Sequence, residues 1–556
     1  MSIKTELAQL IRDALAAAQR SGALPEHDPD EVAVERPQKA EHGDFASSLP
    51  LKLARPLRMA PMAIAQKLAE RMPTSEAVER VTVAPPGFLN VRLKPSWLAS
   101  QVDDVIAAGE AFGNIGLGEG TRVQVEFVSV NPTGPLHVGH ARGAVIGSAL
   151  ADVLQAAGYD VEREYYINDA GSQMDRFNQS LYVRYLQALG RDAELPEGGY
   201  KGEYMAAFGK ELAAEHGDRF AKMPQPDALR DIGKIGLEKM LGAIREDLEL
   251  LRIRMDVWFS ERSLFENGQY DEAMGILEKK GMLVEREGAK WFASTAVGED
   301  KDNVVIRGNG SPTYFASDIA YHYDKFAKRG FDTVIDIWGA DHQGHIARVK
   351  AAAAALGTDP DRLTILAVQI VTFKRRDEVV RLSKRSGDII TLRELVQEVG
   401  ADACRFLFLS RSPDAQLEFD MELAKEQSAD NPVYYVQYAH ARIASILALA
   451  KERGIAFDDG DTSLLSHEAE LALIRKIMEL PDLVELMARK LEPHHLPHYA
   501  MELATAFHWF YGQCRVVSSE PGDLPLTKAR LKLVDAARIG LSRSLRLMGM
   551  DAPDKM

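Results

Sequence analysis

The sequence predicts an α/β core with a parallel sheet, preceded by a small α+β domain and followed by an all-α domain. From about Val123, segments typical of strands alternate with segments of helical periodicity, as in folds whose sheet is parallel. Before that point the chain offers a helix and two short strands, and after about Asp430 strand signals vanish. We therefore expect domains at 1–95, 96–430 and 431–556.

Composition is that of an ordinary globular protein. The 556 residues are 46% hydrophobic and 27% charged. Two cysteines, Cys404 and Cys514, exclude a disulfide framework and a cysteine zinc site, and they fit a reducing cytosol. No signal peptide or membrane span is expected. The net charge of −15 alone argues against nucleic-acid binding, although a local basic face on a large enzyme can still bind RNA.

The N-terminal domain begins with an amphipathic helix over the first 20 residues. An extended stretch at 31–36 and a proline-broken helical run through Met72 follow. VTVAPPGFLNVRL then predicts two short strands around a Pro-Pro-Gly turn. After a helix at 96–108, the glycine-rich FGNIGLGEG precedes a strand and does not follow one, which indicates a linker and not a dinucleotide-binding loop.

In the core, VQVEFVSV predicts a strand that ends at Val130, and a helix over 141–157 is expected to stop at Gly158. Further strands are expected at VEREYYIND, TVIDIWGA and LTILAVQIV, with a helix at 345–356 between the last two. Charged helices at about 190–300 interrupt the alternation and indicate an insertion. From 431 to the end, the periodicity is helical throughout.

The most informative motif is SVNPTGPLHVGHARG, where a strand, a Pro/Gly turn and a helix follow one another. The spacing places His137 and His140 one turn apart at a helix N-terminus, where backbone N–H groups attract anions. Gly139 permits a nucleotide to approach the backbone closely. Two surface histidines at a helix start are the simpler alternative. The position at the carboxyl end of a parallel strand favours a ligand site.

A second motif lies far downstream in VVRLSKRSGDIITL. Ser383 and Lys384 fall in a polar loop between apolar runs, and lysine is a flexible point charge suited to a phosphate. By itself, an exposed basic loop is equally consistent with this pattern.

Together the two motifs resemble the HIGH and KMSKS signatures of class I aminoacyl-tRNA synthetases. HVGH is close to the first. In the second, Ser383 and Lys384 are kept, while Arg381, Leu382 and Arg385 depart from the pattern. HGDFASSLPLKLA, INDAGSQMDRF, SPTYFASDIAYHYDKF and IDIWGADHQGHIARV are similar to blocks of the arginyl family in particular. The resemblance covers essentially the whole chain and implies a Rossmann-like class I catalytic core.

The resemblance also implies roles for individual residues. It makes His137, His140 and Lys384 catalytic. It assigns ATP to Pro135, His137, Gly139, His140, Gly339, Asp341, Ser383 and Lys384, and arginine to Glu126, Ser129, Asn131, Tyr314, Asp318 and His342. The HIGH-type motif comprises Asn131, Pro132, Thr133, Gly134, Pro135, Leu136, His137, Val138, Gly139, His140 and Ala141. Tyr434, Tyr438 and Arg442 are expected to contact tRNA, although a helix-packing stripe explains at least some of these aromatic residues.

The implied activity is ATP-dependent charging of arginine tRNA, with arginyl adenylate as intermediate and bound tRNA needed for the first step. Mg²⁺ would travel with ATP, and no protein-held metal is expected, because His342 and His345 lack accompanying ligands of zinc spacing. We expect a cytoplasmic monomer. The alternatives are another class I synthetase or related nucleotidylyltransferase, and a catalytically silent RNA-binding relative.

Overall fold

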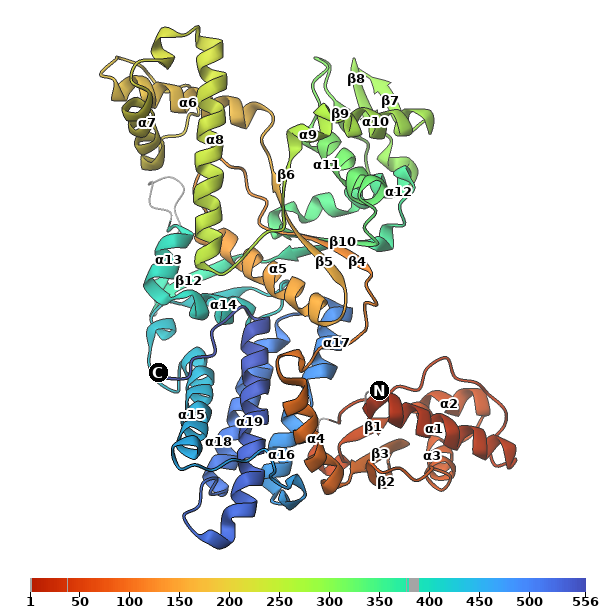
Figure 1. The fold of residues 1–556 in the computed structure, drawn as a ribbon. Helices are drawn as coiled ribbons and strands as arrows, with labels where there is room; N and C mark the ends of the chain where they lie inside the picture. The colour runs from red at the N-terminus through yellow and green to blue at the C-terminus, as the bar shows by residue number, and fades with distance from the viewer. Residues whose placement is uncertain (1–2, 38, 377, 380–389) are drawn as a thin grey trace. The chain divides into compact units, whose positions relative to one another are not determined.

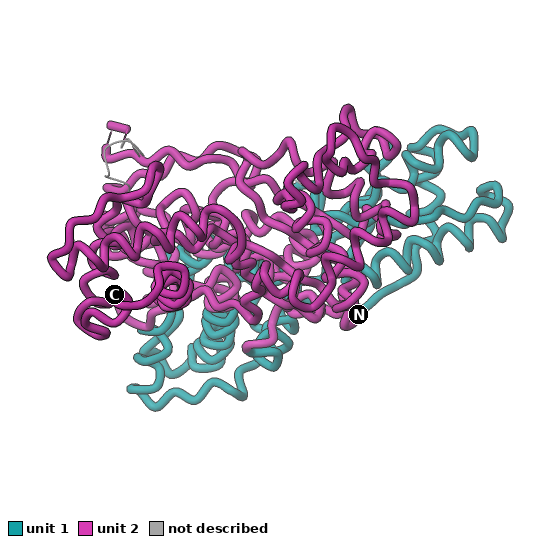
Figure 2. The backbone as a smooth tube through the Cα atoms, turned by 90° about the horizontal axis from the view of Figure 1, so that it is seen from above, with its two compact units in different colours: residues 1–109, 443–478, 505–539 teal, residues 110–442, 479–504, 540–556 magenta. Residues whose placement is uncertain are grey.

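The computed structural model describes residues 3–37, 39–376, 378–379 and 390–556 (Figure 1). Its contacts divide the chain into two units, each of which is described by itself. Unit 1 comprises 1–109, 443–478 and 505–539, and unit 2 comprises 110–442, 479–504 and 540–556 (Figure 2). The C-terminal helical segment therefore contributes residues to both units.

Unit 1 contains a small antiparallel sheet with the strand order β1-β3-β2. The predicted strands around the Pro-Pro-Gly turn are confirmed, and the expected extended stretch makes one bridge, between Glu35 and Ala46. Helix α1 buries an apolar stripe that includes Leu7, Ile11 and Leu15. The elements are α1 (Ile3–Arg20), β1 (Phe45–Ser47), α2 (Leu49–Leu57), α3 (Pro61–Ala69), β2 (Val78–Ala84), β3 (Phe88–Leu93) and α4 (Pro95–Ala108).

Unit 2 is built on a five-stranded parallel sheet with the order β11-β10-β4-β5-β6, which confirms the predicted α/β core. The chain runs from β4 outward to β6 and then returns to place β10 on the other side of β4. This reversal makes a topological switch point between β4 and β10, where α/β sheets bind ligands. The strands are β4 (Arg122–Glu126), β5 (Asp160–Ile167), β6 (Val257–Ser260), β10 (Thr333–Gly339) and β11 (Leu363–Val368).

The prediction that the first of these strands ends at Val130 is wrong, because β4 ends at Glu126. Val128 and Ser129 have φ angles of 71° and 41°, which L-residues rarely adopt. The Ser129 N–H donates to the Phe127 carbonyl at 3.1 Å, and the Ser129 hydroxyl accepts from the Tyr166 N–H at 3.0 Å. The Ser129 hydroxyl thus replaces a backbone carbonyl as the hydrogen-bond acceptor for β5. The chain therefore turns away from the sheet before Val130.

The expected insertion at about 190–300 needs a correction. Long helices do occupy this region, and α6 (Ser172–Ala188) packs against both α7 (Glu203–His216) and α8 (Gln225–Leu250). However, β6 lies inside the same range and pairs in parallel with β5. With only four residues, VWFS is too short to show the alternation that identifies a strand. After α9 (Glu261–Glu266) and α10 (Gln269–Lys279) comes a three-stranded sheet of β7 (Leu283–Arg286), β8 (Ala289–Phe292) and β9 (Asn303–Ile306).

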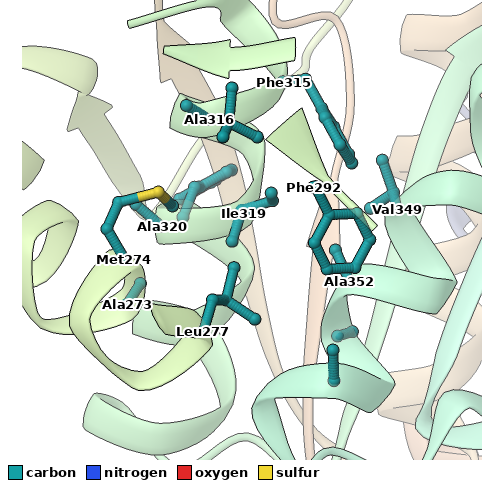
Figure 3. Packing of buried hydrophobic residues seen from close by; sticks show 14 of the residues in the cluster. Ala273, Met274, Leu277, Phe292, Phe315, Ala316, Ile319, Ala320, Val349 and Ala352 are labelled. Atoms are coloured by element: carbon teal, nitrogen blue, oxygen red, sulfur yellow. The ribbon is translucent and has the colours of Figure 1, made fainter. Parts of the chain in front are cut away.

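An apolar cluster supports α11 (Tyr314–Tyr323), the helix that carries two of the predicted arginine contacts. Phe315, Ala316, Ile319 and Ala320 of α11 pack against residues of α10, β8 and α12 (Ile346–Leu356), as Figure 3 shows. A π-helical turn, Asp324–Lys328, follows α11 directly, and turns of this kind are frequent at functional sites. The packing fixes one face of α11 and leaves the other face for the site.

The remaining elements confirm the expected change to helices. A small sheet of β12 (Val371–Arg375), β13 (Glu378–Val379) and β14 (Leu417–Asp420) accompanies α13 (Leu392–Val399) and α14 (Ala401–Leu409). Residues 431–556, all of them described, contain no strand. Their helices are α15 (Pro432–Glu452), α16 (Glu468–Ile477), α17 (Leu480–Lys490), α18 (His495–Gln513) and α19 (Leu524–Leu547). Within the described residues, no helix combines the length and apolarity that crossing a membrane requires.

Candidate active site

The two histidines of the HVGH motif cap the N-terminus of α5 (Val138–Ala156). His137 Nδ1 accepts from the Gly139 N–H at 3.1 Å, and His140 Nδ1 accepts from the His137 N–H at 3.3 Å. An Nδ1 atom that accepts a hydrogen bond is unprotonated, so each neutral ring carries its proton on Nε2. The motif therefore supplies two imidazole N–H donors at a helix N-terminus, a combination suited to phosphate oxygens.

Two buried contacts hold α5 in place. Gly147 lies so close to Phe127 that a Cβ atom would come within 2.3 Å of the phenyl ring. The buried Arg142 donates to carbonyl oxygens of Gln369, Ser412 and Ala415 at 2.7–3.0 Å, which ties α5 to the segments after β11 and before β14. Burial lowers the pKa of Arg142 to about 10, so the guanidinium remains charged at neutral pH.

The turn before α5 is covered by a residue of the inserted helices. The Tyr204 hydroxyl, from α7, donates to the Thr133 carbonyl at 2.6 Å. A Cβ atom on Gly134 would lie 3.4 Å from the Tyr204 hydroxyl oxygen, so a small residue fits this contact. The sequence offered no signal for Tyr204, because the contact spans about 70 residues.

The chain segment just beyond the second motif meets the first motif. Val138 N–H donates to the Ile390 carbonyl at 3.2 Å, and Leu392 N–H donates to the Leu136 carbonyl at 2.9 Å, with His137 and Thr391 forming an antiparallel bridge. The predicted ATP contacts Ser383 and Lys384 themselves lie outside the described residues. The segment that begins at Ile390 is therefore anchored on the HVGH turn.

Three carboxylates, Asp169, Glu261 and Asp318, come together from the ends of β5 and β6 and from α11; we call them the acidic cluster. Glu261 is only 4% exposed, and its Oε2 atom has no hydrogen-bond partner among the described residues. Burial and the charges of Asp318 and Asp169 raise the pKa of Glu261 to about 7, although hydrogen bonds from Ser317 and Tyr166 act to lower it. Burial likewise raises the pKa of Asp318. The nearby charges of Arg348 and Lys325 lower the pKa of Asp318 but do not offset the effect of its burial.

Asp169 has a structural part in this cluster. Its carboxylate accepts from the Ser260 hydroxyl at 2.6 Å and from the Arg262 N–H at 3.0 Å. These bonds fix the start of α9, which carries Glu261. Tyr314, four residues before Asp318 on α11, is 48% exposed, and the charge of Glu261 contributes to raising its pKa. The predicted pair Tyr314 and Asp318 thus does share a helix, beside Glu261.

A fully buried lysine joins the neighbouring strands β4 and β10. Lys325 Nζ donates to Glu126 Oε2 at 2.6 Å and to Asp336 Oδ1 at 2.8 Å. Asp336 Oδ2 pairs with His322 Nε2 at 2.9 Å. Burial raises the pKa of Glu126, whereas Lys325 and His322 hold the pKa of Asp336 at about 2 despite its burial. Lys325, in the π-helical turn, therefore connects β4 and β10 at the switch point to the end of α11.

The other predicted contacts fall into two groups. Asn131, Gly339, Asp341 and His342 are exposed at the ends of β4 and β10, while the Ser129 hydroxyl is engaged by Tyr166. His342 and His345 gather no third metal-ligating residue among those described.

The predicted tRNA contacts lie on α15. Tyr434 and Tyr438 stack at 5.9 Å between ring centroids, and Arg442 donates to the Tyr438 hydroxyl at 2.6 Å. These three form one polar-aromatic stripe.

Two further residues were missed from sequence: Glu261 and Lys325. A glutamate directly after a short apolar segment, VWFSE, would have been a signal once β6 was recognised as a strand, because strand ends of a parallel sheet meet at one edge. Lys325 had no such signal, since a lysine in a helical segment is usually a solvated residue.

Comparison with known proteins agrees with the fold. Family models match along the chain in order: the arginyl tRNA synthetase N terminal domain at 5–93, the catalytic domain of tRNA synthetases class I (R) at 101–444, and the DALR anticodon binding domain at 436–556. The arginine–tRNA ligase of Dehalococcoides mccartyi strain BAV1 is 54% identical, covering 100% of this chain and 99% of the relative. That of Carboxydothermus hydrogenoformans is 48% identical, covering 97% of each.

Among solved structures, the arginyl-tRNA synthetase of Thermus thermophilus has the same fold, with a TM-score of 0.76 at 24% identity over the full length of both chains. The predicted fold class and the predicted resemblance are both confirmed. The HVGH turn, the parallel sheet and the three family models in their order lead to one conclusion: this chain belongs to the arginyl-tRNA synthetase family.

Proposed function

We propose that this chain, by its family an ATP-dependent arginine–tRNA ligase, activates arginine at the switch point between β4 and β10. The arginine carboxylate attacks the α-phosphate of ATP, pyrophosphate leaves, and the 2′-hydroxyl of the terminal tRNA ribose then attacks the adenylate. We propose particular residues for each of these steps.

The observation that carries the proposal is the pairing of Ile390–Leu392 with Leu136–Val138. It supports a role for Ser383 and Lys384 near the triphosphate, across from His137 and His140. Because negative charge develops on phosphate oxygens during transfer, imidazole N–H donors and a lysine ammonium group stabilise the transition state. Pro135, Gly139, Gly339 and Asp341 complete the proposed ATP contacts, with Mg²⁺ carried by ATP itself.

Arginine recognition is assigned to the acidic cluster. A guanidinium presents five donors in a planar fork and stays charged, so it binds best to carboxylates that lack another cation. Glu261 meets that requirement through its Oε2 atom, which has no hydrogen-bond partner among the described residues, and Asp318 and Tyr314 lie beside it. Glu126, Ser129, Asn131 and His342 are proposed for the backbone end of the substrate. A lysine substrate would leave part of this polar surface unpaired and would be rejected.

The tRNA is proposed to contact several parts of the chain. Tyr434, Tyr438 and Arg442 offer aromatic and cationic surface for unstacked bases. We propose domain boundaries at 1–95, 96–430 and 431–556, with the first domain on the tRNA body. A monomer acting in the cytoplasm, and bound tRNA as a requirement for activation, complete the proposal.

Replacing His140 or Lys384 tests the ATP side of the site. With tRNA present, His140→Ala and Lys384→Ala should each lower kcat for aminoacylation by about 10²- to 10³-fold, the usual cost of a lost transition-state donor. His140→Asn keeps an acceptor for the helix cap and should be equally slow, which separates chemistry from stability. Exposed controls, His27→Ala and Lys222→Ala, should remain at the wild-type rate. Near-wild-type activity in both test variants would overturn the assignment.

The pH dependence of arginine binding tests Glu261. Its pKa of about 7 means that the carboxyl is largely protonated at pH 6 and largely ionised at pH 8. Arginine stays a cation throughout, so its affinity, measured by calorimetry, should rise about tenfold between pH 6 and pH 8, in proportion to the ionised fraction. Glu261→Gln should bind weakly at both pH values and show a flat profile. A wild-type affinity that does not change with pH would exclude Glu261 as a direct partner.

A further inference from the structure

A compact group of metal-ligating side chains lies far along the chain from the synthetase motifs, in the connection between α17 and α18. Helix α17 ends at Lys490, and the chain turns sharply at the C-cap residue Leu491, which has a φ of 59°. The Glu492 N–H donates to the Met487 carbonyl at 3.2 Å, and the Leu496 N–H donates to the Pro493 carbonyl at 3.1 Å. This turn brings the side chains of Glu492, His494 and His495 together.

The geometry of the three side chains suits a metal ion. One ligand atom from each lies within 4.8 Å of the other two. Glu492 Oε2 and His495 Nε2 are 3.0 Å apart, and the rings of His494 and His495 are 4.4 Å apart between centroids. Tetrahedral ligands about 2.1 Å from a zinc ion lie roughly 3.4 Å from one another. Small side-chain rotations therefore suffice to enclose an ion.

Helix capping explains only part of this arrangement. Glu492 and His495 could pair simply to close the first turn of α18. That explanation leaves out His494, whose Nδ1 atom is buried and has no hydrogen-bond partner among the described residues. The unpartnered nitrogen of His494 is therefore available as a metal ligand.

We propose that Glu492, His494 and His495 form a binding site for a divalent transition-metal ion of the zinc class. Two imidazoles and one carboxylate are donors that suit Zn²⁺, Ni²⁺, Cu²⁺ or Co²⁺, whereas Mg²⁺ prefers oxygen ligands. The fourth position would hold water, since the three side chains are only half-buried. The site is thus separate from the Mg²⁺ that accompanies ATP.

Such an ion would stabilise the corner between α17 and the start of α18, both within residues 479–504 of unit 2. All three ligands come from a span of four residues, and α17 packs against α5, the helix that begins with the HVGH motif. Because an ion that binds only the folded chain stabilises it by mass action, Zn²⁺ should raise the melting temperature as its concentration passes the dissociation constant.

Cobalt spectroscopy on the full chain, first freed of metal with a chelator, tests the site. Co²⁺ should bind one equivalent, give the visible bands of tetrahedral coordination, and be displaced by Zn²⁺ but not by excess Mg²⁺. Loss of a residue that only hydrogen-bonds to a metal ligand typically weakens metal binding by about 10- to 100-fold. His494→Gln and Glu492→Gln each remove a ligand and should therefore weaken Co²⁺ binding by more than this. His216→Gln is the matched control, because His216 and Glu215 form a His–Glu pair with a separation of 3.8 Å, and no third ligand accompanies them in the part of the chain that the structure describes.

The control should leave Co²⁺ binding unchanged, and all three variants should charge tRNA at the wild-type rate, because none touches the synthetase site. Absence of Co²⁺ and Zn²⁺ binding at about 100 μM, far above the range of a specific zinc-class site, would overturn the proposal. Binding that survives both ligand substitutions, or that depends on His216, would overturn it equally.

Discussion

Asp318→Ala is expected to lower kcat/KM for arginine by about 10²- to 10⁴-fold, while KM for ATP stays within a few-fold of wild type. Removing one partner of a buried charge pair costs about 3–5 kcal/mol, which is the source of this range. The substitution should affect the kinetic parameters for arginine and not those for ATP, because Asp318 lies on α11 and not on the HVGH turn. Steady-state aminoacylation with saturating tRNA, varying each substrate in turn, measures it.

Replacing the Asp318 carboxylate with an amide should not destabilise the chain. Burial raises the pKa of Asp318, so at neutral pH the ionised carboxylate opposes folding and does not support it. Asp318→Asn should therefore melt at or above the wild-type temperature although it has lost activity. This is the result expected for a carboxylate that serves substrate binding and destabilises the fold. Loss of activity that accompanies unfolding, or an equal rise in KM for ATP, would contradict a direct contact with arginine.

Lys325→Met is expected to have the largest effect on stability. It leaves Glu126 and Asp336 buried without their cation, a change that typically costs about 3–5 kcal/mol. Lys325 has a raised pKa and Asp336 a lowered one, so their pairing is fully present at pH 7. It is lost only as the pH falls toward the pKa of Asp336 or rises past that of Lys325. Thermal melting monitored by circular dichroism at pH 7 measures the loss.

A combined variant separates stability from substrate binding. Lys325→Met with Glu126→Gln and Asp336→Asn removes the uncompensated charges and should recover most of the melting temperature. Arginine affinity should remain low, because Glu126, proposed to contact the substrate, has lost its charge. If Lys325→Met melted like wild type, the lysine would not hold these strand ends together.

How far the sequence predicts this molecule depends on the range of the interactions. The parallel core could be predicted, since β5, β10 and β11 are long enough to show apolar strand patterns between helices. The end of β4 could not, because the Ser129 hydroxyl replaces a backbone partner of Tyr166, and nothing in VQVEFVSV records that substitution. The four residues of β6 were likewise too few to identify, so Glu261 at its end was missed.

The candidate site shows the same division. His137 and His140 could be identified because strand, turn and helix N-terminus follow one another in a few residues. Their pairing with the segment at Ile390–Leu392 joins residues about 250 positions apart, and local patterns carry no information on such contacts. Lys325 was unpredictable for a related reason: its carboxylate partners come from β4 and β10.

The central claim is that the carboxylates of Asp318 and Glu261 bind the charge of the guanidinium. Competition between arginine and citrulline tests it most directly, because citrulline has the same shape but a neutral urea in place of the cation. In calorimetric titrations at pH 8, wild type should bind arginine at least about 100-fold more tightly than citrulline, the equivalent of about 2.7 kcal/mol. The ratio of the two affinities should be smaller in Asp318→Asn. Equal affinity for the two amino acids in wild type would contradict the account.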